Sequence, residues 1–260
     1  FYKDKMLSYF EYKYFLYKLI SKLNPFNEIN GIRALMYHSV GSEVENDIFK
    51  IYNISPELFK QHINFLIKKN INILKLSKEI LKDNISGTLI TFDDGYLNNY
   101  EIVEPILTEF NISFTVFVTA NYINKDSFLS SEKLKKLSIK DNVTIGAHGL
   151  NHLHLVNLND VKLYEELYTS KLKIEEVIQK EVYSISYPHG SIDMRVRDIA
   201  EKVGFTIGFT SWPNINYFDR DPLLLSRNVI WSNDDEEVLG QKIIGKWDWM
   251  RLRHKDPLLK

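Results

Sequence analysis

Residues 88–95 read Thr-Leu-Ile-Thr-Phe-Asp-Asp-Gly, an apolar run that ends in two adjacent carboxylates. The part 88–92 has the length and residue types of a buried strand, and a helical pattern at 97–110 follows it. Such a strand–helix alternation recurs about seven times along the chain. This order is typical of a parallel sheet, either a barrel or a doubly wound sheet, whose functional site lies at the carboxyl ends of the strands.

The rest of the alternation predicts a single α/β domain. The helix near residue 58 has a clear start, because Ser55 is a good cap and Pro56 suits the first helical position. Further strands are expected at 34–40, 71–76, 113–119, 143–147, 182–187, 205–210 and 223–230. Further helices are expected at 58–69, 160–179, 193–203 and 236–244.

The composition limits the kinds of functional site that the chain can contain. The chain has 260 residues, 44% of them hydrophobic, a net charge of −1, seven His and no Cys. The near-neutral charge excludes the basic footprint of a nucleic-acid-binding protein. No apolar run approaches the ~18 uninterrupted residues of a membrane span. Without Cys there are no disulfides, thiolate nucleophiles or Cys-based metal sites, so a metal must be held by nitrogen and oxygen ligands.

The two ends of the chain differ from the middle. Residues 1–30 are interpreted as an N-terminal extension whose segment 6–23 forms an aromatic, Lys-rich amphipathic helix. This helix either packs on the domain or lies in a membrane interface, with its Lys side chains near anionic head groups. Residues 31–246 form the predicted domain, and 247–260 are interpreted as a charged C-terminal tail.

Ionisable residues gather at the predicted strand ends. Asp93 and Asp94 follow the strand 88–92, where a helix cap explains one carboxylate and a bound metal would explain the other. His148 and His152 follow the strand 143–147, and one helical turn would place both rings on the same side. His pairs at this spacing commonly bind zinc or another borderline metal.

The other His residues lie outside these two motifs. His38 lies near the end of the strand 34–40, and the tight turn 187–190 has backbone N–H groups that could face a ligand. His154 is interpreted as a structural or supporting residue. His62 and His254 are interpreted as surface residues.

These motifs together resemble those of the polysaccharide deacetylases, the NodB-homology enzymes (carbohydrate esterase family 4) that remove N-acetyl, sometimes O-acetyl, groups from sugars. The resemblance spans about residues 32–230 and implies a distorted (β/α) barrel of about seven parallel strands. It rests on Thr91-Phe92-Asp93-Asp94-Gly95, on His148-x-x-x-His152-x-x-Leu155, and on Tyr187-Pro188-His189-Gly190.

The resemblance also implies roles for individual residues. Asp94, His148 and His152 match a metal triad, and Asp93 matches the catalytic base. The turn Tyr187-Pro188-His189-Gly190 matches the segment that lines the acetyl groove and offers a backbone N–H to the oxyanion. The implied cofactor is a divalent metal, with Zn²⁺ favoured over Co²⁺, Ni²⁺, Mn²⁺ and Fe²⁺.

The chain departs from the family pattern in two places. Ser186 stands where the third motif often has an Arg held against the base, and Arg227 is the candidate to replace it. A late Leu-x-His motif that supplies the general acid is missing. Met36-Tyr37-His38-Ser39-Val40 instead resembles the early element of a permuted subgroup that includes biofilm poly-N-acetylglucosamine deacetylases. His38 is therefore the candidate acid, with His189 as the second choice.

The predicted function is metal-dependent removal of the N-acetyl group of an amino sugar, in a surface polysaccharide or its lipid- or nucleotide-linked precursor. The alternatives are a catalytically impaired sugar-binding member of the same fold and an iron oxygenase with two His and one carboxylate. Tyr187, Trp212 and Trp231 fit either sugar stacking or the core. The expected location is the cytoplasm, with membrane contact through residues 6–23, and export is the alternative; the oligomeric state stays open.

Overall fold

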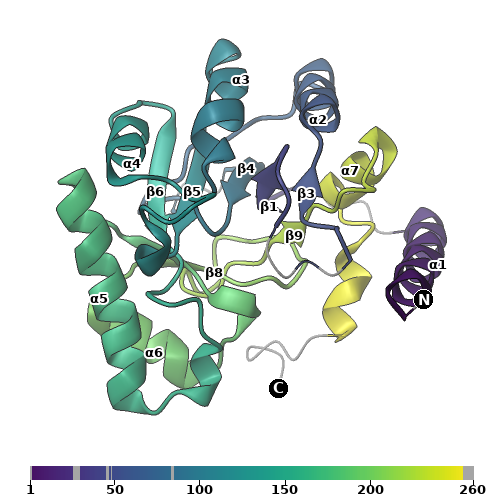
Figure 1. Ribbon diagram of the computed structural model, residues 1–260. Helices are drawn as coiled ribbons and strands as arrows, with labels where there is room; N and C mark the ends of the chain where they lie inside the picture. Colours follow the sequence, from purple (N-terminus) through teal and green to yellow (C-terminus); the bar gives the residue numbers. More distant parts are fainter. Residues whose placement is uncertain (1, 26–29, 45–46, 48, 83–84, 254–260) are drawn as a thin grey trace.

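The computed structural model describes residues 2–25, 30–44, 47, 49–82 and 85–253 (Figure 1). Seven strands form one sheet in the order β8-β7-β6-β5-β4-β1-β9, and all neighbouring strands run parallel. In Figure 1 the strands lie at the centre and the helices surround them. This arrangement confirms the predicted α/β fold with a distorted barrel.

The strands are short, and most of the helices lie between them in the chain. The sheet contains β1 (Ile32–Tyr37), β4 (Gly87–Phe92), β5 (Phe114–Val118), β6 (Val143–Ala147), β7 (Ser184–Ser186), β8 (Ile207–Phe209) and β9 (Asn228–Val229); β2 (Ser39–Val40) pairs separately with β3 (Asn53–Ile54). The α-helices are α1 (Tyr2–Leu23), α2 (Pro56–Lys68), α3 (Glu104–Glu109), α4 (Ser131–Ser138), α5 (Asp160–Ile178), α6 (Met194–Val203) and α7 (Glu236–Ile243). A π-helical turn, Asn99–Val103, precedes α3, and 3₁₀ turns occur at Ala120–Tyr122, Leu155–Asn157, Pro188–Gly190 and Asp248–Arg253.

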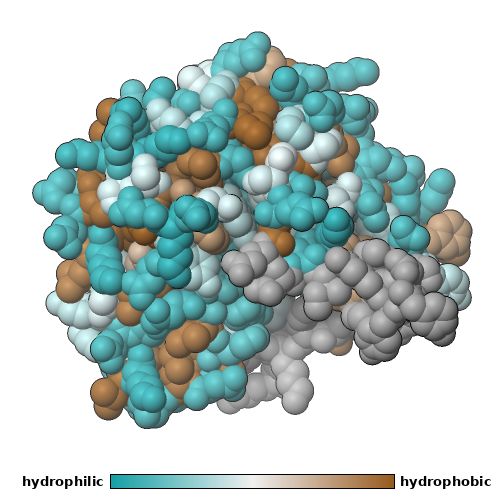
Figure 2. Space-filling view, in the orientation of Figure 1, coloured by the Kyte–Doolittle hydropathy of each residue, from teal (hydrophilic) through white to brown (hydrophobic). Residues whose placement is uncertain are grey.

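The central strands are apolar because both of their faces are covered. Every residue of β1, β5 and β6 is buried, and so is every residue of β4 except Gly87. Such continuous burial is expected of parallel strands between a filled interior and an outer layer of helices. Polar side chains at the strand ends are therefore placed by a rigid support. The face shown in Figure 2 is mostly hydrophilic, with scattered hydrophobic groups.

The two edges of the sheet are linked by residues 222–229. Leu225 N–H donates to the Gly208 carbonyl at 2.8 Å, and Thr210 N–H donates to the Leu225 carbonyl at 2.8 Å. β9 then pairs with β1 on the other edge. The strand expected at 223–230 is thus irregular, because one part of it bonds to β8 and only its end joins β1.

Some expected elements are wrong or were missed. The strand predicted at 71–76 is reduced to one isolated bridge between Ile73 and Thr88. The helix α4 was not expected, because it has only eight residues and buries only Leu134, Leu137 and Ser138.

His62 is not a surface residue. It lies on the buried stripe of α2 with Phe59, Ile63 and Leu66. Its Nε2–H donates to the Asp234 carbonyl at 2.7 Å, and its Nδ1 accepts from the Tyr37 hydroxyl at 3.2 Å. The helical spacing of 59, 62, 63 and 66 determines this position, and the two hydrogen bonds satisfy the ring. His254 lies outside the described residues.

Packing against the domain continues beyond residue 246, into the segment interpreted as a tail. Trp247 is buried, and Asp248 forms a buried ion pair with Arg33 at 2.7 Å. Residues 247–248 therefore belong structurally to the barrel.

Gly146 on β6 leaves no room for a side chain. A Cβ there would lie 2.4 Å from Phe117 Cδ1 and 2.7 Å from Ser184 Oγ. We expect Gly146→Ala to lower the free energy of unfolding by about 1–3 kcal/mol, as overpacked core sites do. Urea unfolding measures this. The comparison variant is Gly240→Ala in α7, where a Cβ would lie 3.0 Å from Phe65 Cζ and the helix propensity of Ala, about 1 kcal/mol better than that of Gly, opposes the cost of this contact. Equal losses in both variants would show that the Phe117 contact is not the cause.

Candidate active site

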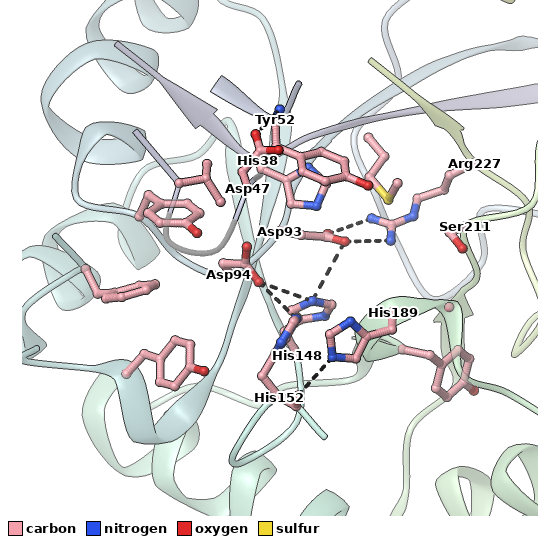
Figure 3. A pocket seen from close by; sticks show the side chains of 17 residues that line it. His38, Asp47, Tyr52, Asp93, Asp94, His148, His152, His189, Ser211 and Arg227 are labelled. Carbon is pink, nitrogen blue, oxygen red and sulfur yellow. Dashed lines mark hydrogen bonds and ion pairs between the residues drawn. The ribbon is translucent and has the colours of Figure 1, made fainter. Parts of the chain in front are cut away.

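The residues singled out at the strand ends converge on one cavity of about 370 Å³ (Figure 3). Asp93 and Asp94 follow β4, His148 follows β6, and His38 follows β1. Because the strands are parallel, their carboxyl ends meet at one edge of the barrel. The other predicted residues that line the cavity are His152, Tyr187, His189, Gly190 and Arg227.

Asp94, His148 and His152 form a compact group. Asp94 Oδ1 lies 3.4 Å from His148 Nε2 and 3.3 Å from His152 Nε2. Their three potential ligand atoms lie within 4.8 Å of one another, and within the described ranges no other His, Cys, Asp or Glu cluster has this geometry. The two nitrogens and one oxygen are the donor set that zinc and related metals accept.

The two His rings meet without the predicted helical turn. Gly149 and His152 have φ values of +73° and +58°, so the segment is a loop. Buried Glu166 on α5 holds this loop, because its Oε1 accepts from the Leu150 and Asn151 N–H groups at 2.9 and 2.6 Å. Glu166 was missed because nothing near it in the sequence indicates a tie to residue 150.

The surroundings of this group fit a cation. His148 Nδ1–H donates to the Ser186 carbonyl at 2.8 Å, which leaves the Nε2 lone pair directed toward Asp94. Asp94 Oδ1 is buried and has no hydrogen-bond partner among the described residues. Burial and the charge of Asp93 raise the pKa of Asp94 to about 7, and burial lowers the pKa of His148 and of His152. A positive ion would compensate Asp94 and use both imidazoles in their neutral form.

Asp93 has the opposite environment. Arg227 donates from both terminal nitrogens, Nη1 to Oδ1 and Nη2 to Oδ2, each at 2.7 Å. The Ser186 hydroxyl donates to Oδ2 at 2.9 Å. Burial alone would raise the pKa of Asp93, but the charge and the hydrogen bonds of Arg227 hold it well below its usual range. Asp93 is therefore a fixed, ionised carboxylate beside Asp94.

Arg227 is itself held from several sides. Its Nε–H donates to the Thr210 carbonyl at 2.9 Å, and its guanidinium lies 5.6 and 5.7 Å from the ring centroids of Phe117 and Phe209. Its Nη2 also donates to Ser186 Oγ at 2.6 Å. Ser186 thus contacts an Arg that lies just before β9.

His38 lies beside Asp93, and in the view of Figure 3 Asp93 separates it from His148. Its ring centroid is 4.5 Å from that of Tyr52. Its Nδ1 is buried and has no hydrogen-bond partner in the described part of the chain. Burial lowers the pKa of His38 to about 4, against the opposing effect of Asp93. The imidazole is therefore uncharged at neutral pH.

The turn at 187–190 uses most of its own amide groups. Gly190 N–H donates to the Tyr187 carbonyl at 2.9 Å, and Pro188 has no N–H. Among the amide groups of this turn, the His189 N–H is therefore the candidate donor to an oxyanion. The His189 ring donates from Nε2 to the His152 carbonyl at 3.2 Å and stacks on His154, with centroids 4.0 Å apart.

The structure places the proposed stacking residues in the core. Tyr187, Trp212 and Trp231 are all buried, and the Tyr187 hydroxyl donates to the Leu223 carbonyl. Other aromatic residues, missed in the sequence, line the cavity in loops that follow β4 and β5: Tyr96, Tyr122 and Phe128. The Phe128 ring centroid lies 4.9 Å from that of Tyr96 and 4.7 Å from that of Tyr122. The only sequence signal is that Tyr96 and Tyr122 each come four residues after a strand end; Phe128 has no such signal.

Known proteins resemble this chain in sequence and in fold. Residues 82–208 match the sequence model of the polysaccharide deacetylase family. The Bacillus subtilis protein YxkH, which carries that family name, is 28% identical over 199 residues, 74% of this chain and 69% of its own. The peptidoglycan-N-acetylglucosamine deacetylase of Bacillus cereus is 29% identical over 124 residues, 47% of this chain and 55% of its own.

The fold of the chain also matches that of a solved structure. IcaB from Ammonifex degensii superposes with a TM-score of 0.73 at 21% identity, over 84% of this chain and 97% of that one, which shows a shared fold. Residues 82–208, just under half of the chain, thus carry the sequence of a polysaccharide deacetylase domain, and the relatives and the shared barrel agree with this match.

Proposed function

We propose that this chain is a metal-dependent deacetylase that hydrolyses the N-acetyl group of an amino sugar. One observation carries the proposal: two adjacent buried carboxylates have opposite partners. Asp93 is neutralised by Arg227, whereas Asp94 faces two neutral imidazoles. A site that only bound sugar would have no use for this division, but a metal ligand beside a general base requires it.

Asp94, His148 and His152 would hold the metal, with Zn²⁺ as the favoured ion. Three protein ligands leave coordination positions for water and substrate, as in catalytic rather than structural sites. When bound, such an ion would lower the pKa of a water from near 16 toward ~7 and polarise the acetyl carbonyl.

The remaining roles fall to the residues around this triad. Asp93, fixed by Arg227, accepts the proton of the attacking water, and the His189 amide donates to the developing oxyanion. His38 protonates the leaving amine. Because its imidazole is uncharged beforehand, the proton that it delivers must reach it during the reaction.

Two observations support an N-acetyl sugar as the substrate. The aromatic wall of Tyr96, Tyr122 and Phe128 suits the apolar face of a pyranose ring. The Bacillus cereus relative is named for N-acetylglucosamine. We infer a surface polysaccharide or its lipid- or nucleotide-linked precursor as the carrier of this sugar.

The alternatives have less support. An impaired sugar-binding member was considered because the third motif lacks its Arg, but Arg227 supplies that contact to Asp93. An iron oxygenase would share the ligand set, but the family match is to hydrolases.

Acetate release measured over a substrate panel tests the proposal. The panel contains nucleotide-linked and lipid-linked N-acetyl sugars and N-acetylglucosamine oligomers, and metal content is determined on the same sample. We expect acetate from at least one of them, in proportion to bound metal. Sugar binding without acetate from any substrate would favour the impaired module. Turnover that needs oxygen and ferrous iron would favour the oxygenase.

His38→Gln tests the acid. We expect turnover of the N-acetyl sugar to fall about 10²-fold, the lower range for loss of a general acid. Hydrolysis of 4-nitrophenyl acetate should change little, since its phenolate leaves without protonation. Equal losses with both substrates would show that His38 acts in some other way.

A further inference from the structure

The helix α1 is held against the barrel by one of its faces, beside α7 (Figure 1). The Tyr14 hydroxyl donates to the Asn233 carbonyl at 2.8 Å and to Asp234 Oδ1 at 3.0 Å. Lys18 Nζ pairs with Asp235 at 2.6 Å, and Trp249 Nε1–H donates to Ser21 Oγ at 2.9 Å. These directional contacts, spread over two turns, fix the rotation of the helix about its axis.

The opposite face of α1 is apolar and exposed. Five large side chains there are exposed by between 47% and 76% of their surface: Tyr12, Phe15, Leu19, Ile20 and Leu23. Their spacing places them on one side of a helix, away from Tyr14 and Ser21. Because the inner contacts fix the helix, this face cannot turn inward. We call these five residues the outer face of α1. A contiguous exposed apolar patch marks an interaction surface.

One Lys borders the outer face on each side, and Glu11 lies next to Lys22 on its flank. At 100° per residue, Lys13 lies on one flank and Lys22 on the other, and Lys22 is largely exposed, with Nζ 3.9 Å from Glu237 Oε1. From Phe10 to Leu23 the helix has three Lys against one Glu, and one of the three, Lys18, faces inward and pairs with Asp235. An apolar face between flanking Lys residues complements a surface that is apolar inside and negative outside.

We propose that the outer face of α1 inserts into the interfacial layer of a membrane that contains anionic lipids. The helix lies in the plane of the membrane and does not cross it; no described helix is long and apolar enough to do so. The inference is independent of the catalytic proposal, since α1 contributes no residue to the cavity.

A second copy of the chain fits this face less well. A symmetric contact between two α1 helices places the same surface on both sides, so Lys13 and Lys22 of one copy would lie near those of the other. Like charges at such a contact oppose association. Anionic head groups would meet the same two Lys residues with opposite charge.

Vesicle co-sedimentation of the full chain tests the proposal. The probes are vesicles of phosphatidylglycerol and phosphatidylcholine in equal parts, and vesicles of phosphatidylcholine alone. We expect binding to the mixed vesicles that weakens with salt, and an affinity at least about tenfold lower for Phe15→Ser/Leu19→Ser. Lys13→Gln/Lys22→Gln should weaken binding to the mixed vesicles and leave the phosphatidylcholine result unchanged.

The matched control is Tyr164→Ser/Leu172→Ser, which removes two exposed apolar side chains from α5. It should bind vesicles as the unchanged chain does. Circular dichroism and acetate release from a soluble substrate should be the same for all variants. No binding to the mixed vesicles, or equal losses in the α1 and α5 variants, overturns the proposal. A dimer in sedimentation analysis that Phe15→Ser/Leu19→Ser abolishes would also overturn it, in favour of self-association.

Discussion

Asp94→Asn is expected to lose both its metal and its activity. Asn keeps the size of the side chain but removes the one negative charge among the three proposed ligands. Because the activated water and the polarised carbonyl both depend on the ion, we expect deacetylation to fall by more than about 10⁴-fold. Elemental analysis after dialysis, together with acetate release, measures the two effects.

A second carboxylate in the same cavity provides the control. Asp47 lines the cavity but is not part of the triad, so Asp47→Asn should retain the metal.

The stability of Asp94→Asn gives a further check on this assignment. The pKa of Asp94 is about 7, above its unfolded value, so its charge opposes folding above that unfolded pKa. In the presence of a chelator at neutral pH, the urea concentration at which Asp94→Asn unfolds should be no lower than that of the unchanged chain. Full metal occupancy in Asp94→Asn would remove the triad assignment.

Asp93→Asn is expected to keep the metal and lose turnover. The amide cannot take a proton from water, so kcat should fall about 10³- to 10⁴-fold. The substitution also leaves Arg227 buried without its counter-charge, which costs about 3–5 kcal/mol for a buried pair. Steady-state kinetics, metal content and denaturant unfolding of one preparation separate the three quantities.

A double substitution separates catalysis from stability. In Asp93→Asn/Arg227→Met the uncompensated charge is gone, so part of the lost stability should return while activity stays low. Recovery of activity along with stability would mean that Asp93 serves the fold and is not the base. An Asp93→Asn enzyme within tenfold of normal turnover would lead to the same conclusion.

The local parts of the site could be predicted from the sequence. A buried strand that runs into Asp93-Asp94 places two carboxylates at the barrel edge whatever the rest of the chain does. His148 and His152 were paired correctly but for the wrong geometric reason. Gly149 turns the backbone out of a helix, and the rings meet because Glu166 holds the loop. A contact of this kind depends on tertiary packing.

Distant contacts could be predicted only in part. Arg227 was proposed from the resemblance, since no pattern in the sequence links it to Asp93, 134 residues earlier. His62 was misassigned because a polar residue on an apolar helical stripe was interpreted as exposed. Tyr96, Tyr122 and Phe128 were missed because loops have no periodicity, and only the folded barrel shows which loop side chains face the cavity.

The ion pair between Asp93 and Arg227 also affects the stage of folding at which the active site can form. Asp93 follows β4, but its counter-charge lies 134 residues later, just before β9. Contacts of such long sequence separation form slowly, because a large loop must close first. Until the C-terminal segment docks between β8 and β1, Asp93 is a carboxylate without compensation, and it opposes burial of its own strand end. We therefore expect a chain that ends before residue 227 to lack hydrolytic activity, even though it contains Asp94, His148 and His152.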